Sequence, residues 1–137
     1  MQIKILSIGI IKKDDAILLR KKFDGSLPYK ETWYLFGGEV NEVTSSPDKS
    51  LIALVKDQAG IDISVAEHLG WDTEVKHDHD GEEKLFIYLD NLCEYVGGEL
   101  QWGDDIEKLE WVLIEKLSTY DLVPPTTKLL KKLGYLY

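Results

Sequence analysis

The stretch "GGEVNEVTSSPDKSLIALVKDQAGI", residues 37–61, runs from a double glycine through a polar loop into a segment with helical periodicity. Ser46 followed by Pro47 is a typical helix start, and Asp48 places negative charge where the helix dipole favours it. Apolar residues then recur every three or four positions until Gly60, a typical helix stop. The stretch therefore predicts a helix of about three turns that follows a glycine-terminated strand.

The segments before this stretch predict three strands. "IKILSIGIIKK" (3–13) and "AILLRKK" (16–22) are rich in Ile and Leu and are separated by two aspartates, which suits a hairpin. Glycine, proline and polar residues then mark a loop. The apolar "WYLF" (33–36) predicts a short strand that enters the double glycine directly.

The segments after the predicted helix are mostly strands. "IDISVAEHLGWDTEV" (61–75) and "KLFIYLDNLCEYV" (84–96) predict a pair joined across the polar loop "KHDHDGEE". "LEWVLIEKL" (109–117) predicts a strand that enters a short helix, and "VPPTTKLLKKLGYLY" (123–137) predicts a helix that starts at its prolines. This order implies an α/β (α+β) domain, with helices packed on the faces of a mixed sheet.

The length and charge of the chain bound its class. It has 137 residues, which predicts a single domain over residues 1–137, and a formal net charge of -9 from 25 acidic and 16 basic residues. A nucleic-acid backbone and an anionic membrane are bound through counter-charge, so neither is expected as a partner. A small anionic ligand, held locally or through a divalent metal, is compatible with this charge.

The single cysteine, Cys93, cannot form an internal disulfide, which fits a reducing cytoplasm. It lies near the end of a predicted strand, where we expect a buried structural thiol rather than a nucleophile. The N-terminal apolar run is broken by Lys4 and has no small-residue cleavage site, so we expect a strand and not a signal peptide. No apolar stretch approaches the roughly 20 residues that span a bilayer.

The double glycine, the polar loop and the capped helix that ends in "AGI" resemble the Nudix box, G-x5-E-x7-R-E-U-x-E-E-x-G-U, where U is aliphatic. "WYLFGG" is similar to the lead-in of that box, "AILLRKK" to the strand before it, and "GDDIEKLEWVLIEKL" to a segment late in the domain. The resemblance covers nearly the whole chain. It implies the Nudix fold, a mixed β-sheet sandwiched between helices, and an enzyme that uses Mg2+ or Mn2+ to cleave a nucleoside diphosphate linked to another moiety.

The box is degenerate in its charged positions. When it is aligned from its right end, Ala53 takes the Arg position, Leu54 the next Glu, and Asp57 and Gln58 the paired Glu positions. Glutamates at i, i+3 and i+4 would form an acidic ridge that holds a divalent cation. Leu54 cannot bind such a cation and Gln58 offers only a neutral carbonyl. Asp57 is therefore the retained box carboxylate and the candidate catalytic residue.

Other residues are candidate metal ligands beside Asp57. Gly38 could contribute its main-chain carbonyl, and glycine there permits close approach of a ligand. Glu42 is the carboxylate nearest to the upstream box glutamate position, and Glu83 belongs to the acidic loop that follows the first of the paired strands. His77 and His79 alternate in that loop, but two ligands without a third are a weak metal signal.

The substrate-binding candidates lie outside the helix. By family resemblance Arg20, on the second predicted strand, contacts phosphate or base, although a solvent-facing strand arginine is the alternative. Tyr34 and Phe36 could offer a stacking face to a base, but alternation along a strand lets only some of these aromatic residues face one side.

Three functions follow from these residues. The preferred one is a Nudix-fold protein that binds a phosphorylated ligand, such as a nucleotide, with weak or no hydrolysis. The alternatives are an active Mg2+-dependent pyrophosphohydrolase that uses Asp57 and loop carboxylates, and a protein-interaction domain without a ligand. Because two-fold dimers are the commonest soluble assemblies, a homodimer is also expected.

Overall fold

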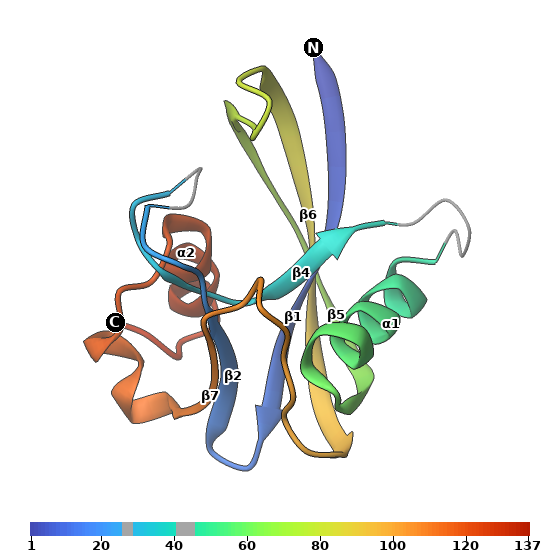
Figure 1. Cartoon of the computed structure of the whole chain (residues 1–137), viewed down its shortest axis with the longest axis vertical. Helices are drawn as coiled ribbons and strands as arrows, with labels where there is room; N and C mark the ends of the chain where they lie inside the picture. The colour runs from blue at the N-terminus through green and yellow to red at the C-terminus, as the bar shows by residue number, and fades with distance from the viewer. Residues whose placement is uncertain (26–28, 41–45) are drawn as a thin grey trace.

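The computed structural model describes residues 1–25, 29–40 and 46–137, which form a seven-stranded sheet with helices packed on it (Figure 1). The strands are β1 (Gln2–Lys13), β2 (Ala16–Lys21), β3 (Trp33–Tyr34), β4 (Phe36–Glu39), β5 (Asp62–His77), β6 (Glu83–Gly97) and β7 (Lys108–Leu113). The helices are α1 (Pro47–Ala59), the 3₁₀ helix η1 (Ile114–Thr119) and α2 (Pro124–Lys132). The predicted opening hairpin is β1 with β2, and the predicted later pair is β5 with β6.

The sheet is mixed, as the sequence predicts. Its path is β3-β2-β1-β6-β5, with β4 paired to β1 and β7 paired to β2. Strands β1 and β6 are parallel, whereas the other pairs are antiparallel. The predicted short strand at "WYLF" is divided at Leu35, because β3 pairs with β2 and β4 pairs with β1. Leu35 instead donates its N–H to Thr126 Oγ1 at 3.3 Å.

The two α-helices cover opposite faces of the sheet. Successive residues of a strand point to opposite sides. Ile11 of β1 belongs to a core cluster with Leu51 and Val55 of α1, whereas Ile10 belongs to a second cluster with Leu129 of α2. Figure 1 shows α1 and α2 on either side of the sheet. The predicted sandwich of a mixed sheet between helices is therefore confirmed.

The capping of α1 confirms its predicted limits. Ser46 Oγ accepts a hydrogen bond from Lys49 N at 3.3 Å, and Pro47 is the first helical residue. Gly60 has a φ of 75° and donates its N–H to Lys56 O at 3.1 Å. Glycine adopts this left-handed conformation at little cost, which explains why the helix ends there.

The β5–β6 hairpin and the start of β1 extend beyond the helices (Figure 1). On the side of the sheet that α1 packs against, this extension exposes apolar side chains. Ile3, Ile5, Trp71 and Val75 are between 44% and 69% exposed. The register places Leu85, Ile87 and Leu89 of β6 on the same side, between the β1 residues and the β5 residues. We define the outer apolar face as Ile3, Ile5, Trp71, Val75, Leu85, Ile87 and Leu89.

Cys93 is fully buried, as predicted, and burial raises the pKa of its thiol to about 12. The thiol is therefore protonated at neutral pH and packs as a small apolar group. Among the helices that the structure describes, none has the length and apolarity to cross a bilayer.

The C-cap of α1 gives a test of the fold. A Cβ added at Gly60 would lie 3.0 Å from Glu99 O, whereas one added at Gly81, with a φ of 83°, would meet nothing within 4 Å. Both Gly→Ala changes carry the left-handed penalty of about 1–2 kcal/mol. We expect Gly60→Ala to lower the free energy of unfolding in urea by at least about 1 kcal/mol more than Gly81→Ala. Equal losses would contradict the close packing of Gly60 against the Glu99 backbone.

Candidate ligand-binding site

A cavity of about 750 Å³ lies on the side of the sheet that α2 covers. This volume is within the usual range for small-molecule sites, about 300–1,000 Å³. Tyr29, Tyr34, the β4 segment and the first turn of α2 form its walls. The floor consists of alternate residues of three adjacent strands, namely Lys4, Leu6, Ile8, Asp72, Glu74, Lys76, Phe86, Tyr88 and Asp90.

Strand register explains why these floor residues meet. Asp72 of β5 lies opposite Tyr88 of β6, and Glu74 lies opposite Phe86. On the other side of β6, Phe86 lies opposite Lys4 of β1. Residues paired across strands share a face of the sheet, and the pattern repeats every second residue. The alternation therefore directs charged and aromatic side chains of three strands into the same cavity.

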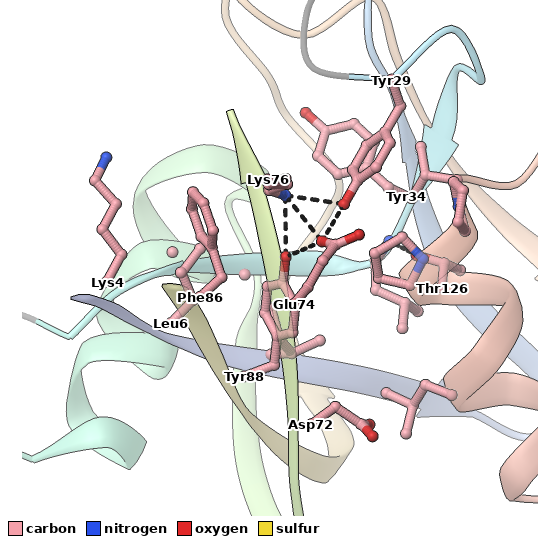
Figure 2. A pocket seen from close by; sticks show the side chains of 18 of the residues that line it. Lys4, Leu6, Tyr29, Tyr34, Asp72, Glu74, Lys76, Phe86, Tyr88 and Thr126 are labelled. Atoms are coloured by element: carbon pink, nitrogen blue, oxygen red, sulfur yellow. Dashed lines mark hydrogen bonds and ion pairs between the residues drawn. The ribbon is translucent and has the colours of Figure 1, made fainter. Parts of the chain in front are cut away.

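Lys76 is held at the centre of a hydrogen-bonded cluster (Figure 2). Its Nζ donates to Tyr29 OH at 2.9 Å and to Tyr88 OH at 3.0 Å, and lies 3.4 Å from Glu74 Oε1. Both tyrosine hydroxyls donate to Glu74 Oε1, that of Tyr88 at 2.7 Å. Nζ also lies 4.4 Å from the centroid of the Phe86 ring. The cluster fixes one ammonium group at the cavity surface.

The electrostatics of this cluster follow from burial and hydrogen bonding. Burial lowers the pKa of Lys76, and the nearby Glu74 carboxylate opposes that change. Burial also disfavours the Glu74 carboxylate, but hydrogen bonds from Tyr29 and Tyr88 outweigh it and lower the pKa of Glu74. Burial, together with Glu74, raises the pKa of both tyrosines, so their hydroxyls stay neutral donors.

A second cationic group lies near β4. Lys4 Nζ is 3.0 Å from Glu39 Oε1 and 2.6 Å from Asp78 Oδ2. Lys84 Nζ lies 2.9 Å from the same Asp78 oxygen. Hydrogen bonds from Lys4 and Lys84 hold the pKa of Asp78 well below its usual range. This carboxylate therefore stays charged and ties β1 to the β5–β6 loop at the edge of the cavity.

A pair of carboxyl groups, Asp72 and Asp90, lies at the other end of the floor. Asp90 is 3% exposed, and its Oδ2 has no hydrogen-bond donor among the described residues. Burial raises the pKa of Asp90 to about 7, and a hydrogen bond and repulsion between it and Asp72 act in the same direction. Lys128 Nζ lies 3.5 Å from Asp72 Oδ1.

Arg20 joins the strands to α1. Its Nη1 donates to Gln58 Oε1 at 2.7 Å, and its Nη2 donates to Gly37 O at 3.0 Å. The guanidinium is buried and lies 4.3 Å from the Tyr34 ring centroid. Ala53 of α1 takes the box position at which the family pattern has an arginine. The arginine that contacts this helix is instead Arg20, which comes from β2. The predicted role of Arg20 in ligand binding stays a prediction.

The box positions of α1 do not line the cavity. Leu54 packs beside Gly38, where an added Cβ would lie 3.1 Å from either Leu54 methyl. Asp57 is exposed and is not among the lining residues, and Gln58 is engaged by Arg20. Within the described ranges, no three His, Cys, Asp or Glu side chains are arranged to hold a metal ion. These residues do not fit Mg2+ or Mn2+ in the way that the family resemblance implies.

The other predicted site residues are divided between the cavity and the rest of the molecule. Gly38 and Tyr34 line the cavity. Phe36 is fully buried in the core cluster of α1, so it packs there instead of offering a stacking face. Glu83 is exposed at the start of β6 and is not a lining residue. Glu42 lies outside the described residues.

Most residues of the cavity floor were not among the predicted site residues. The signal that could have found it is the period of two in "DTEVK", which places Asp72, Glu74 and Lys76 on one face of β5. The same period in "FIYLD" places Phe86, Tyr88 and Asp90 on one face of β6. Charged residues at alternate positions facing inward indicate a polar cavity, because such groups are costly to bury in an apolar core.

Comparisons with known proteins agree with this fold. The ADP-ribose pyrophosphatase of Methanocaldococcus jannaschii is 29% identical over 109 residues, which cover 80% of this chain and 61% of the relative. The chain thus matches about three fifths of that relative's length. No protein-family model matches the sequence.

Solved structures give the same result. The MutT NUDIX hydrolase from Burkholderia pseudomallei superimposes with a TM-score of 0.72 over 97% of this chain and 99% of its own, at 20% identity. The NUDIX domain of Shewanella oneidensis NrtR, solved in complex with ADP ribose, has a TM-score of 0.66 over 98% of this chain and 86% of its own, at 15% identity. The chain is therefore a Nudix-fold protein, and the resemblance drawn from the double glycine and helix is confirmed.

The Asp72–Asp90 pair predicts a specific pH dependence of stability. Asp90 holds its proton up to about pH 7 in the folded chain, against an ordinary value of 3.8. Between these values Asp90 is protonated in the folded state and ionised in the unfolded state, so its own contribution to the free energy of unfolding falls as pH rises from about 4 to about 7. We expect Asp90→Asn to reduce this fall, as measured by urea unfolding at several pH values. The exposed Asp57→Asn serves as a control that retains the fall, and identical profiles for Asp90→Asn and the natural chain would contradict the assignment.

Proposed function

We propose that this chain binds a nucleotide-like phosphorylated ligand in the cavity and hydrolyses it weakly or not at all. The observation that carries the proposal is a cavity with fixed ammonium groups on its floor beside a box helix that lacks the acidic ridge. The ligand class is supported by the solved NUDIX domain that holds ADP ribose and by the name of the archaeal relative.

The cationic residues of the cavity support an anionic ligand. Lys4, Lys76 and Lys128 line this cavity, each beside a carboxyl group that also lines it, and Arg20 and Lys22 add two further cations. The Lys76 ammonium is held by two tyrosine hydroxyls and Glu74, so little side-chain entropy is lost when it meets a phosphate. A Lys ammonium binds phosphate as a compact point charge. A diphosphate can therefore be held by charge that does not come from a metal.

The packing of Leu54 supports weak turnover. An apolar side chain beside Gly38 takes the position of a box glutamate, and Asp57 is exposed away from the cavity lining. Hydrolysis by family resemblance needs a metal to neutralise the diphosphate and to orient a water. With a single box carboxylate, the helix supplies too few hard ligands for that task.

An active hydrolase is the second candidate, because the archaeal relative is named as an ADP-ribose pyrophosphatase. Such an enzyme would use Asp57 together with carboxylates of the loop after β4. Glu39 already pairs with Lys4 at 3.0 Å, and Glu42 lies outside the described residues. The third candidate, a protein-interaction domain, would leave the cavity without a ligand. The predicted location in the cytoplasm stays a prediction.

Titration calorimetry with ADP-ribose tests binding and turnover together. We expect a similar dissociation constant with Mg2+ and with EDTA, and an affinity about tenfold or more lower in Lys76→Met, because a charge-assisted contact is lost. Lys56→Met is the matched control, since Lys56 is an exposed lysine of α1 that does not line the cavity.

Chromatography of the same samples measures cleavage. We expect no AMP above the level of a protein-free control. Mg2+-dependent AMP release that disappears in Asp57→Asn would favour the second candidate and contradict weak turnover. Failure of the natural chain to bind ADP-ribose or any nucleoside diphosphate would contradict the first candidate.

We also propose a two-fold dimer through the outer apolar face. Its seven residues carry no charge, so two copies of a chain with a net charge of -9 can approach there with little repulsion at the contact. A contiguous exposed apolar patch is more typical of an interface than of a monomer surface.

Light scattering over a range of concentrations tests this dimer. We expect Trp71→Lys, at a position that is 69% exposed, to shift the chain to a monomer because a charge would be buried at the interface. Trp102→Lys changes a tryptophan that is 43% exposed and lies outside the outer apolar face, so the dimer should persist. A natural chain that is monomeric at every concentration would contradict the proposal.

A further inference from the structure

Tyr29 is a cavity residue that contacts two ammonium groups at once. It lies in the connection between β2 and β3 and lines the cavity together with Lys22 and Lys76. Lys22 Nζ donates to the main-chain oxygen of Tyr29, and Lys76 Nζ donates to its hydroxyl at 2.9 Å. The ring centroid lies 5.9 Å from Lys22 Nζ and 4.5 Å from Lys76 Nζ. Figure 2 shows the Tyr29 hydroxyl directed at the Lys76 ammonium.

The Lys76 ammonium already uses its full hydrogen-bonding capacity. An ammonium group has three N–H donors. The hydroxyls of Tyr29 and Tyr88 accept from Lys76, and Glu74 Oε1 lies 3.4 Å away as the third acceptor. A phosphate that contacts this ammonium group therefore has to replace one of the three.

Of these three acceptors, Tyr29 is the one that can move without disturbing the sheet. Glu74 pairs with Phe86 across β5 and β6, and Tyr88 pairs with Leu6 of β1. Among the described residues, no hydrogen bond between main-chain atoms involves Tyr29. Displacement of Tyr29 breaks contacts of its hydroxyl and its carbonyl oxygen only, whereas displacement of Glu74 or Tyr88 would distort the cavity floor.

The two ammonium groups that Tyr29 contacts repel each other. Burial lowers the pKa of both lysines, and repulsion from Lys22 adds to the change at Lys76, whereas nearby carboxylates oppose it. Tyr29 offers each ammonium group a neutral oxygen, which does not offset this repulsion. Phosphate oxygens are anionic, and hydrogen bonds between ammonium and phosphate are among the stronger ones in proteins. The exchange of Tyr29 for phosphate is therefore favourable for both lysines.

We propose that Tyr29 occupies the position of the ligand's diphosphate, and that binding displaces its side chain so that Lys22 and Lys76 hold the diphosphate together. This inference rests on the proposed binding of a nucleotide-like ligand and assigns residues to its diphosphate. Tyr88 and Glu74 stay in place and keep the Lys76 ammonium oriented. A diphosphate has one phosphate for each ammonium group, so it gains more from the exchange than a monophosphate. Tyr29 is thus an internal competitor of the ligand.

Calorimetric titration with ADP tests this competition. We expect Tyr29→Ala to bind ADP at least about tenfold more tightly than the natural chain, because the competing ring and hydroxyl are removed. Tyr29→Phe removes the hydroxyl alone and should bind about threefold more tightly. Tyr88→Phe is the matched control, since it removes the same two hydrogen bonds, from Lys76 and to Glu74, at a residue of β6. It should bind ADP no more tightly than the natural chain, because Tyr29 stays in place and Lys76 loses its orientation.

The ratio of ADP affinity to AMP affinity identifies the second ammonium group. We expect Lys22→Met to lower this ratio at least about threefold, because one of the two charges that face the diphosphate is lost. Lys30→Met, at an exposed lysine of the same connection that does not line the cavity, should preserve the ratio. Urea unfolding of each variant verifies that it is folded.

The outcomes separate this inference from the proposed function. Weaker or unchanged ADP binding by both Tyr29 variants would overturn the inference and leave nucleotide binding intact, because Tyr29 would then not compete with the ligand. A ratio unchanged in Lys22→Met would also overturn it. Absence of ADP binding by the natural chain and by Tyr29→Ala alike would overturn the proposed function and this inference with it.

Discussion

The parallel pairing of β1 with β6 is the constraint on which the other elements depend. It runs in continuous register from Gln2 opposite Lys84 to Lys12 opposite Glu94. One face of β1 packs against α1, and the other packs against α2 and then continues into the cavity floor. β1 also pairs with β4, so it sets the position of the double glycine relative to both helices. A one-residue shift in this register would exchange core and cavity residues along the whole strand.

Packing and capping residues define α1. Leu51 and Val55 are buried in the core, and the cap residues Ser46 and Gly60 still define the helix ends. Leu54, at a glutamate position, adds apolar contact beside Gly38. Because packing and capping fix the helix independently of its charged residues, those residues could be replaced without loss of the fold.

Arg20 explains how the loop stays attached to this helix. In the family pattern an arginine on the helix pairs with box carboxylates, and here that position is alanine. Arg20 instead reaches from β2 to Gln58 and to the Gly37 carbonyl. The buried guanidinium also lies over the Tyr34 and Phe36 rings, which attract a cation. The contact between the double glycine and α1 is therefore made by an arginine of β2.

Local signals predicted most of the fold, and long-range pairing accounts for what they missed. The cap of α1, the hairpin turns and the prolines of α2 are encoded within a few residues, so their limits could be predicted. The cavity depends on which strands become neighbours. Lys4 and Phe86 meet only because β1 pairs with β6, and no local pattern specifies that pairing. Phe36 illustrates the same limit, since alternation alone does not say which face of a strand becomes core.

Most buried polar groups around the cavity have hydrogen-bond partners. Lys4, Lys76 and Lys84 all have acceptors within hydrogen-bond distance. Among the buried side-chain atoms that the structure describes, Arg20 Nε and Asp90 Oδ2 lack partners, and both residues line the cavity. Each such atom costs about 1–3 kcal/mol, a large share of the stability of a domain of this size. Both atoms are buried, so each is a cost that the packing around the cavity has to offset.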